Sequence, residues 1–170
     1  YTGEIGFELY VRNEVEKQLW DALFSTNVKL EAIGLAARDT LRLEKGFCLY
    51  GNDINDFTSP IEAGLGWITK FTKEFVNSEN LKKQKEEGVS RKLVAIELID
   101  KGIARKDYLI VDVDGKEIGV ITSGTMSPTL NKSIALGYVS SEYKSVDSEI
   151  YIQVRKKQIK ANVVSLPFVK

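Results

Sequence analysis

Six short apolar runs separated by turn residues fill the second half of the sequence, and they constrain its fold more than any other feature. They cover residues 93–98, 108–113, 118–122, 134–139, 150–154 and 159–164. Val and Ile recur in them, as expected of strands, and Asp114-Gly115 is typical of a tight type I′ hairpin turn. We therefore predict a small antiparallel barrel or sandwich, with a long polar loop over residues 123–132.

The first half is organised around residues 33–54. Gly34 and Gly46 bracket about ten good helix formers, so we predict a helix over residues 35–45. Within it Arg38 and Arg42 stand four residues apart and therefore share one face. Such a pair is either a solvated surface or a face that binds an anionic ligand.

The segments before this helix alternate between strand and helix signals. Apolar residues at every second position predict a strand over residues 5–11, which places Glu4 at its mouth. Asn13 and Glu16 have the spacing of a helix-capping pair, so a packing helix is expected to start at Asn13. With a further short strand over residues 28–33, this half reads as an incomplete α+β layer.

The boundary between the two halves is predicted from a change in composition. Ser59-Pro60-Ile61-Glu62 has the pattern of a capped helix start, and a charged stretch follows over residues 70–92. We expect that stretch to form a surface helix at a domain boundary. The predicted division is residues 1–79, a charged linker over residues 80–91, and a β-barrel domain over residues 92–170.

Composition excludes several classes of function. Lys plus Arg and Asp plus Glu both number 24, so the net charge does not suggest a nucleic-acid partner. There is no histidine and a single cysteine, so we expect no metal site and no internal disulfide. No apolar run approaches the roughly 18 residues of a membrane span, and no signal peptide is evident. We expect a cytoplasmic protein, or one of the mitochondrial matrix if the source is eukaryotic.

Several segments, taken in order, resemble the T-protein family, the aminomethyltransferases of the glycine cleavage system. They are residues 1–8 (YTGEIGFE), 37–44 (ARDTLRLE), 49–54 (LYGNDI), 59–67 (SPIEAGLGW) and 120–130 (VITSGTMSPTL). The resemblance spans nearly the whole chain. Because the first of these segments falls near the middle of the family's longer chain, the sequence is expected to be the C-terminal half of such a protein.

The resemblance implies a function and two site residues. Members of the family take an aminomethyl group from the lipoyl arm of the H-protein and pass its one-carbon unit to tetrahydrofolate, releasing ammonia. Glu4 matches the glutamate that binds the pterin, and Arg38 matches an arginine that contacts folate. The family's catalytic aspartate belongs to the N-terminal half, so no catalytic residue is expected here, and the chain alone is expected to be inactive.

Two related functions stay open at the level of sequence. One is the folate-binding tail of a dimethylglycine or sarcosine dehydrogenase, in which a flavin domain would precede this half. The other is a folate-dependent protein that repairs iron–sulfur enzymes, whose hallmark is a Lys-Gly-Cys-Tyr-x-Gly-Gln-Glu motif. Here Lys45-Gly46 is followed by Phe47 and Cys48, so that motif is broken.

Overall fold

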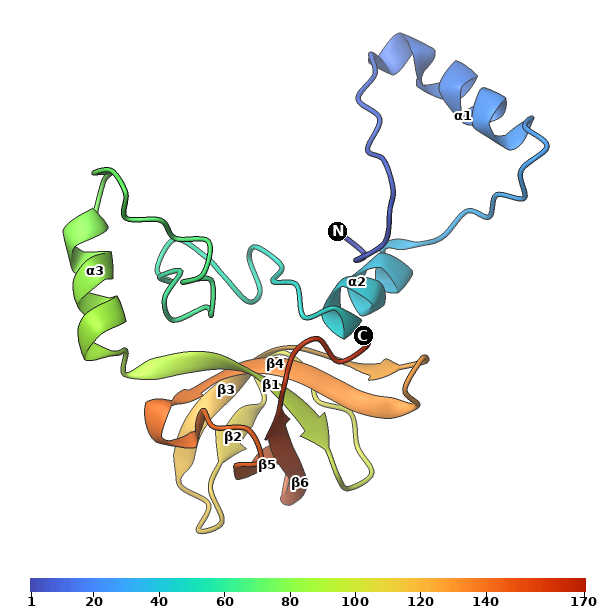
Figure 1. The fold of residues 1–170 in the computed structure, drawn as a ribbon. Coiled ribbons are helices and arrows are strands. Elements are labelled where there is room, and N and C mark those ends of the chain that lie inside the picture. The colour runs from blue at the N-terminus through green and yellow to red at the C-terminus, as the bar shows by residue number, and fades with distance from the viewer.

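The computed structural model describes residues 1–170, and its second half closes into a six-stranded antiparallel barrel (Figure 1). Around the barrel the strand order is β1-β4-β3-β2-β5-β6. The strands are β1 (Arg91–Leu98), β2 (Leu109–Val111), β3 (Glu117–Ser127), β4 (Lys132–Ser140), β5 (Glu149–Val154) and β6 (Lys157–Val164), with a short 3-10 helix, η2 (Ser141–Tyr143), after β4. The predicted strands and the predicted barrel are confirmed.

The barrel interior is the main hydrophobic core of the molecule. Fourteen buried residues form it, and Ile96, Ile110, Ile121, Ile150 and Ile152 among them are fully buried. β1 pairs with β6, so the sheet closes on itself and no strand is left with an unpaired edge. The barrel is therefore a rigid base for the elements packed on its outside.

Two details of the barrel differ from the prediction. In the turn after β2 only Gly115 has positive φ, so the turn is not type I′. The Asp112 carboxylate there accepts hydrogen bonds from the backbone N–H groups of Asp114 and Lys116. The predicted polar loop is also wrong, because β3 continues to Ser127 and β4 begins at Lys132.

Helix α2 (Leu35–Glu44) packs on the outside of the barrel, where the end of the chain also lies (Figure 1). Leu43 is fully buried in a second apolar cluster with residues of β1 and β4. Gly46, which follows the C-cap Lys45, terminates the helix: it has φ 74°, and a side chain there would collide with Leu166. The predicted helix and its terminating glycine are confirmed.

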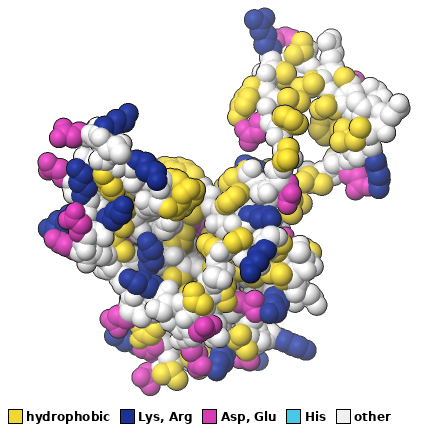
Figure 2. Space-filling model, viewed as in Figure 1, with side chains coloured by type: hydrophobic (Ala, Val, Ile, Leu, Met, Phe, Trp, Pro, Cys, Tyr) yellow, Lys and Arg dark blue, Asp and Glu magenta, His cyan; other side chains and the backbone are white.

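The segment before α2 projects away from the barrel (Figure 1). It contains the 3-10 helix η1 (Asn13–Val15) and helix α1 (Glu16–Phe24), and the side chain of Asn13 does not cap α1. The strands predicted over residues 5–11 and 28–33 do not form, because no segment of the chain lies beside them to pair with. Figure 2 shows apolar side chains gathered on this projecting part, and Ile5, Phe7 and Tyr10 are almost fully exposed.

The chain between α2 and the barrel consists of turns and helix α3 (Ser78–Glu87). This helix lies within the charged stretch that was expected to form a surface helix. Ser59 and Glu62 form the predicted reciprocal capping pair: each backbone N–H donates to the other side chain, at 2.9 and 3.1 Å. The expected helix at Pro60 does not follow, since the chain continues in turns through Gly64. Glu62 also pairs with Arg91 of β1 at 2.8 Å, which ties this segment to the barrel.

The ion pair of Glu62 with Arg91 is expected to make the free energy of unfolding depend on pH in the acidic range. Burial alone would raise the pKa of Glu62, but hydrogen bonds from Arg91 and Ser59 outweigh it and lower the pKa below its ordinary value. A carboxylate whose pKa is lower in the folded state contributes stability above its unfolded pKa and loses it as the pH falls through the folded pKa. In urea titrations between pH 7 and pH 3, Glu62→Gln should therefore reduce the loss of unfolding free energy on acidification. An identical pH profile for the two proteins would contradict this.

Candidate functional site

Of the two residues predicted to bind folate, Arg38 belongs to helix α2 and Glu4 lies beside it. Tyr1, three residues before Glu4, packs against this region: its hydroxyl donates to the backbone oxygen of Cys48 at 3.0 Å, and the Arg38 guanidinium lies 4.7 Å above its ring. Glu4 lies 3.6 Å from the ammonium of Lys45, at the other end of the helix. Arg38 and Lys45 are seven residues apart, about two helical turns, and so share one side of α2.

Both of these side chains are available to a ligand. The side chain of Glu4 is 75% exposed, and its one ion pair is the long contact with Lys45. Arg38 is exposed and has no carboxylate within ion-pair distance. An exposed carboxylate and a guanidinium without an ion-pair partner together offer acceptors and forked donors to a bound molecule.

Arg42 has a different environment from Arg38, although the sequence places them on the same helix face. Its side chain is fully buried and pairs with the buried carboxylate of Asp53 at 2.6 Å. It also donates to Asp39, to the backbone oxygen of Phe47 and to the hydroxyl of Ser123. Burial works to lower the pKa of Arg42, but Asp53 and Asp39 outweigh it, and the pKa is raised above its ordinary value.

Asp53 is the anion at the centre of this cluster. Its carboxylate accepts hydrogen bonds from the Thr122 hydroxyl at 2.5 Å and from the backbone N–H of Leu49 at 2.9 Å. Its backbone oxygen accepts one from the hydroxyl of Tyr138 on β4. Sequence reasoning did not single out this aspartate, because nothing local in residues 49–54 shows that it is buried against an arginine of α2.

Glu44 makes a second buried polar connection between α2 and the barrel. Its carboxylate accepts hydrogen bonds from the hydroxyls of Ser127, at 2.5 Å, and Thr129, at 3.0 Å. Its backbone oxygen accepts one from the N–H of Val169, so the end of the chain is held against the same helix. The C-terminal end of α2 is thus held by buried hydrogen bonds, while its N-terminal end carries the exposed Arg38.

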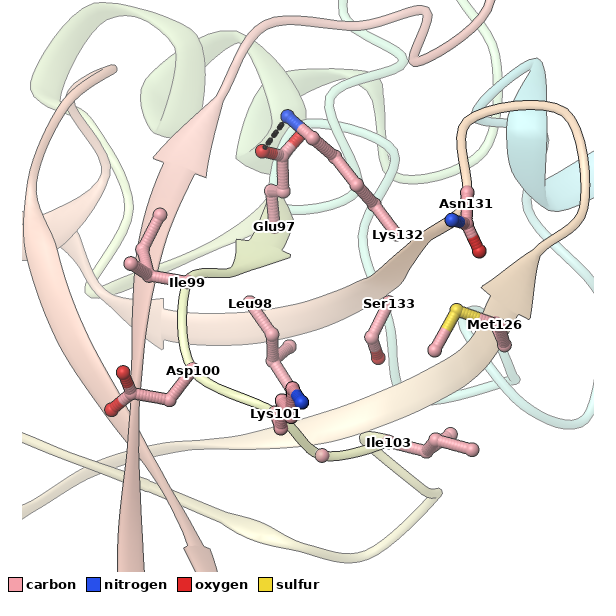
Figure 3. Close-up of a pocket in the computed structure, with 11 residues that line it drawn as sticks. Glu97, Leu98, Ile99, Asp100, Lys101, Ile103, Met126, Asn131, Lys132 and Ser133 are labelled. Carbon is pink, nitrogen blue, oxygen red and sulfur yellow. Dashed lines mark hydrogen bonds and ion pairs between the residues drawn. The ribbon is translucent and has the colours of Figure 1, made fainter.

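The depression in Figure 3 lies on the barrel wall and contains none of the predicted site residues. It has a volume of about 570 Å³ and is lined by the end of β1, the chain that follows it, and the hairpin between β3 and β4. Its nearest charged pair, Lys132 and Glu97, is joined at 2.6 Å, as the dashed line shows.

Cys48 is predicted to be an unreactive thiol. Burial, and to a smaller extent Asp53, raises its pKa to about 11, which leaves little thiolate near neutral pH. In the native protein at pH 8, labelling by a disulfide reagent should be at least roughly tenfold slower than for an exposed cysteine. The rate should rise to the ordinary value in denaturant. Equal rates in the native and denatured proteins would contradict the buried environment.

No group of three potential metal-ligating side chains is assembled anywhere in residues 1–170. Every helix of the structure is too short or too polar to cross a lipid bilayer.

Comparison with known proteins assigns both parts of the fold. Residues 1–73 match the family model described as the GCVT N-terminal domain, and residues 91–170 match the glycine cleavage T-protein C-terminal barrel domain. The chain therefore belongs to the glycine cleavage T-protein family, the aminomethyltransferases of the glycine cleavage system. The resemblance first seen in the sequence is confirmed.

Individual relatives agree with this assignment. The chain is 60% identical over 172 residues to an aminomethyltransferase of Flavobacterium psychrophilum and 55% identical over 174 residues to one of Bacteroides thetaiotaomicron. Each match covers 100% of this chain and 48% of the relative. The crystal structure of glycine cleavage system aminomethyltransferase T from Bartonella henselae superposes with a TM-score of 0.86 at 35% identity, over 92% of this chain and 44% of that one. The chain thus spans about half the length of the relatives it matches.

Proposed function

We propose that the chain is part of an aminomethyltransferase that passes a one-carbon unit from the aminomethyl-lipoyl arm of the H-protein to tetrahydrofolate, with release of ammonia. The observation that carries the proposal is the match of both parts of the chain to the two domains of one enzyme family. Relatives named aminomethyltransferase at 55–60% identity support the same reaction class. Both of these relatives are named as aminomethyltransferases and neither as a dehydrogenase or an iron–sulfur repair protein.

Glu4 and Arg38 are proposed to bind tetrahydrofolate. A carboxylate can accept two hydrogen bonds from the amino group and ring N–H along one edge of the pterin, which is the role proposed for Glu4. A guanidinium offers paired donors and a positive charge to the anionic part of the ligand, which is the role proposed for Arg38. The exposure of both side chains, with Arg38 on α2 and Glu4 next to the end of that helix, supports this assignment.

The domain division predicted from the sequence is kept as part of the proposal. The two family models leave residues 74–90 unmatched, and α3 occupies residues 78–87 of that interval. This agrees with a linker over residues 80–91 that joins the folate-binding part to the barrel. The H-protein is the proposed partner, and neither nucleic acid nor a membrane is part of the reaction.

The proposed division of labour predicts that the 170-residue chain alone does not turn over, because the catalytic carboxylate is proposed to lie outside it. The test mixes aminomethylated H-protein with tetrahydrofolate and measures ammonia release. A full-length protein carrying this sequence should release ammonia, and the 170-residue chain should match the rate without enzyme. Turnover by the chain alone would contradict the division of labour, and failure of the full-length protein would contradict the proposed reaction.

A further inference from the structure

Strand β3 contains one extra residue, and that residue changes which side chains face the helix. Ile121 of β3 pairs with Gly137 of β4, and Ser123 pairs with Leu136, the residue just before Gly137. Two steps along β3 thus match one step along β4, and Thr122 is the unmatched residue of a β-bulge.

The bulge reverses the alternation of the strand. Ile121 belongs to the core inside the barrel, so Ser123, two residues later, would face the same interior in a regular strand. Instead Ser123 shares the outward face of its partner Leu136, which packs with Leu43 of α2. The same change of phase brings Ser127, four residues further on, to the side that faces the helix.

Each hydroxyl placed by the bulge binds a charged residue of the α2 cluster. The Ser123 hydroxyl accepts a hydrogen bond from Arg42 at 2.8 Å, and Thr122 donates to Asp53, the partner of Arg42. Ser127 donates to Glu44. Two successive residues of β3 therefore hold the two sides of the buried Arg42–Asp53 pair.

These contacts fix the position and orientation of the Arg42 side chain. Its guanidinium donates to four acceptors, Asp39, Phe47, Asp53 and Ser123, from a fully buried position. A planar fork with fixed donors has one orientation that satisfies all of them, whereas a lysine could satisfy fewer. The cluster can thus fix the rotation and position of α2 on the barrel, beyond simply burying its apolar side.

We infer that Arg42 is a positioning residue: held by Asp53 and by the β3 bulge, it sets the orientation of α2 and thereby presents Arg38, one turn earlier, to tetrahydrofolate. This inference rests on the proposed function, because it assumes that Arg38 binds the ligand. It assigns the bulge at Thr122 a role in ligand binding although neither Thr122 nor Ser123 touches the ligand.

Hydrogen exchange in the full-length protein tests whether the cluster holds the helix. Arg42→Lys and the milder Ser123→Ala should speed exchange of the α2 amides relative to those of the barrel strands. Ser140→Ala is the matched control, since its hydroxyl also makes one hydrogen bond on the barrel, to the backbone of Ile118, but not to α2. Unchanged exchange in α2 for both variants would overturn the inference.

A binding cycle separates positioning from a purely structural role. Arg42→Lys should weaken tetrahydrofolate binding about tenfold in the unchanged background and add almost nothing once Arg38 is alanine. Ser123→Ala should show the same dependence with a smaller loss, and Ser140→Ala none in either background. Equal losses with and without Arg38, or lower stability with unchanged affinity, would show that Arg42 serves stability alone. If Arg38→Ala itself binds as tightly as the unchanged protein, the proposed role of Arg38 fails and the positioning role fails with it.

Discussion

Arg42→Ala is expected to lower the free energy of unfolding of the full-length protein by about 3–5 kcal/mol, the usual loss when one partner of a buried ion pair is removed. The reason is the buried state of both partners: the side chains of Arg42 and Asp53 are each 0% exposed. Without the guanidinium, the carboxylate of Asp53 keeps only neutral donors, from Thr122 and Leu49. The loss should appear in urea unfolding as a lower midpoint with an unchanged slope.

Arg38→Ala provides the matched control, four residues away on the same helix. Arg38 is exposed and its one described interaction is with the Tyr1 ring, so its removal should cost at most about 1 kcal/mol. A loss for Arg42→Ala as small as that for Arg38→Ala would show that the buried pair does not stabilise α2 on the barrel.

The barrel could be predicted because its signals are local. Each strand is a short run of β-branched and other apolar residues between turns, and the turn before β3 is marked by Asp114-Gly115. Helix α2 could be predicted in the same way, from Gly34 and Gly46, which bracket it. Such patterns depend on the strand or helix itself and therefore survive without knowledge of its neighbours.

The bulge and the buried cluster could not be read in the same way. Arg38 and Arg42 look alike in the sequence, and only the fold shows that Arg42 contacts Asp53 and Ser123, and that Asp53 also binds Thr122. Strand β3 continues through the stretch expected to be a loop. After the bulge, Ser123 and Ser127 are buried against the polar cluster instead of facing water. Long-range pairing of this kind leaves no local pattern.

The strands predicted before α2 have a clear local pattern, but they do not form. Residues 5–11 carry a clear alternation of apolar side chains, yet a strand requires a hydrogen-bonded neighbour as well as a pattern. Within residues 1–170 no segment pairs with them, and Ile5 and Phe7 remain exposed. The alternation is present in the sequence, but the strand predicted from it does not form in this chain.

Glu4→Gln in the full-length protein is expected to weaken tetrahydrofolate binding by roughly ten- to a hundredfold. The substitution keeps the shape of the side chain but replaces an acceptor with a donor that faces the donors of the pterin edge. It removes one charge-assisted hydrogen bond, worth about 1.5–3 kcal/mol, which matches that loss of affinity at about 1.4 kcal/mol per decade. Arg38→Lys should weaken binding less than Arg38→Ala, because lysine keeps the charge and loses only the forked geometry.

Calorimetric titration of the full-length protein with tetrahydrofolate, comparing Glu4→Gln and Arg38→Ala with the unchanged protein, tests the central claim most directly. Lys17→Ala is a suitable control, because Lys17 lies on α1 and is mostly exposed, paired only with Asp21. The claim predicts weaker binding for both site variants, unchanged binding for the control, and unfolding free energies within about 1 kcal/mol of the unchanged protein for all of them. Affinity that stays the same in both Glu4→Gln and Arg38→Ala would contradict the assignment of this site to folate.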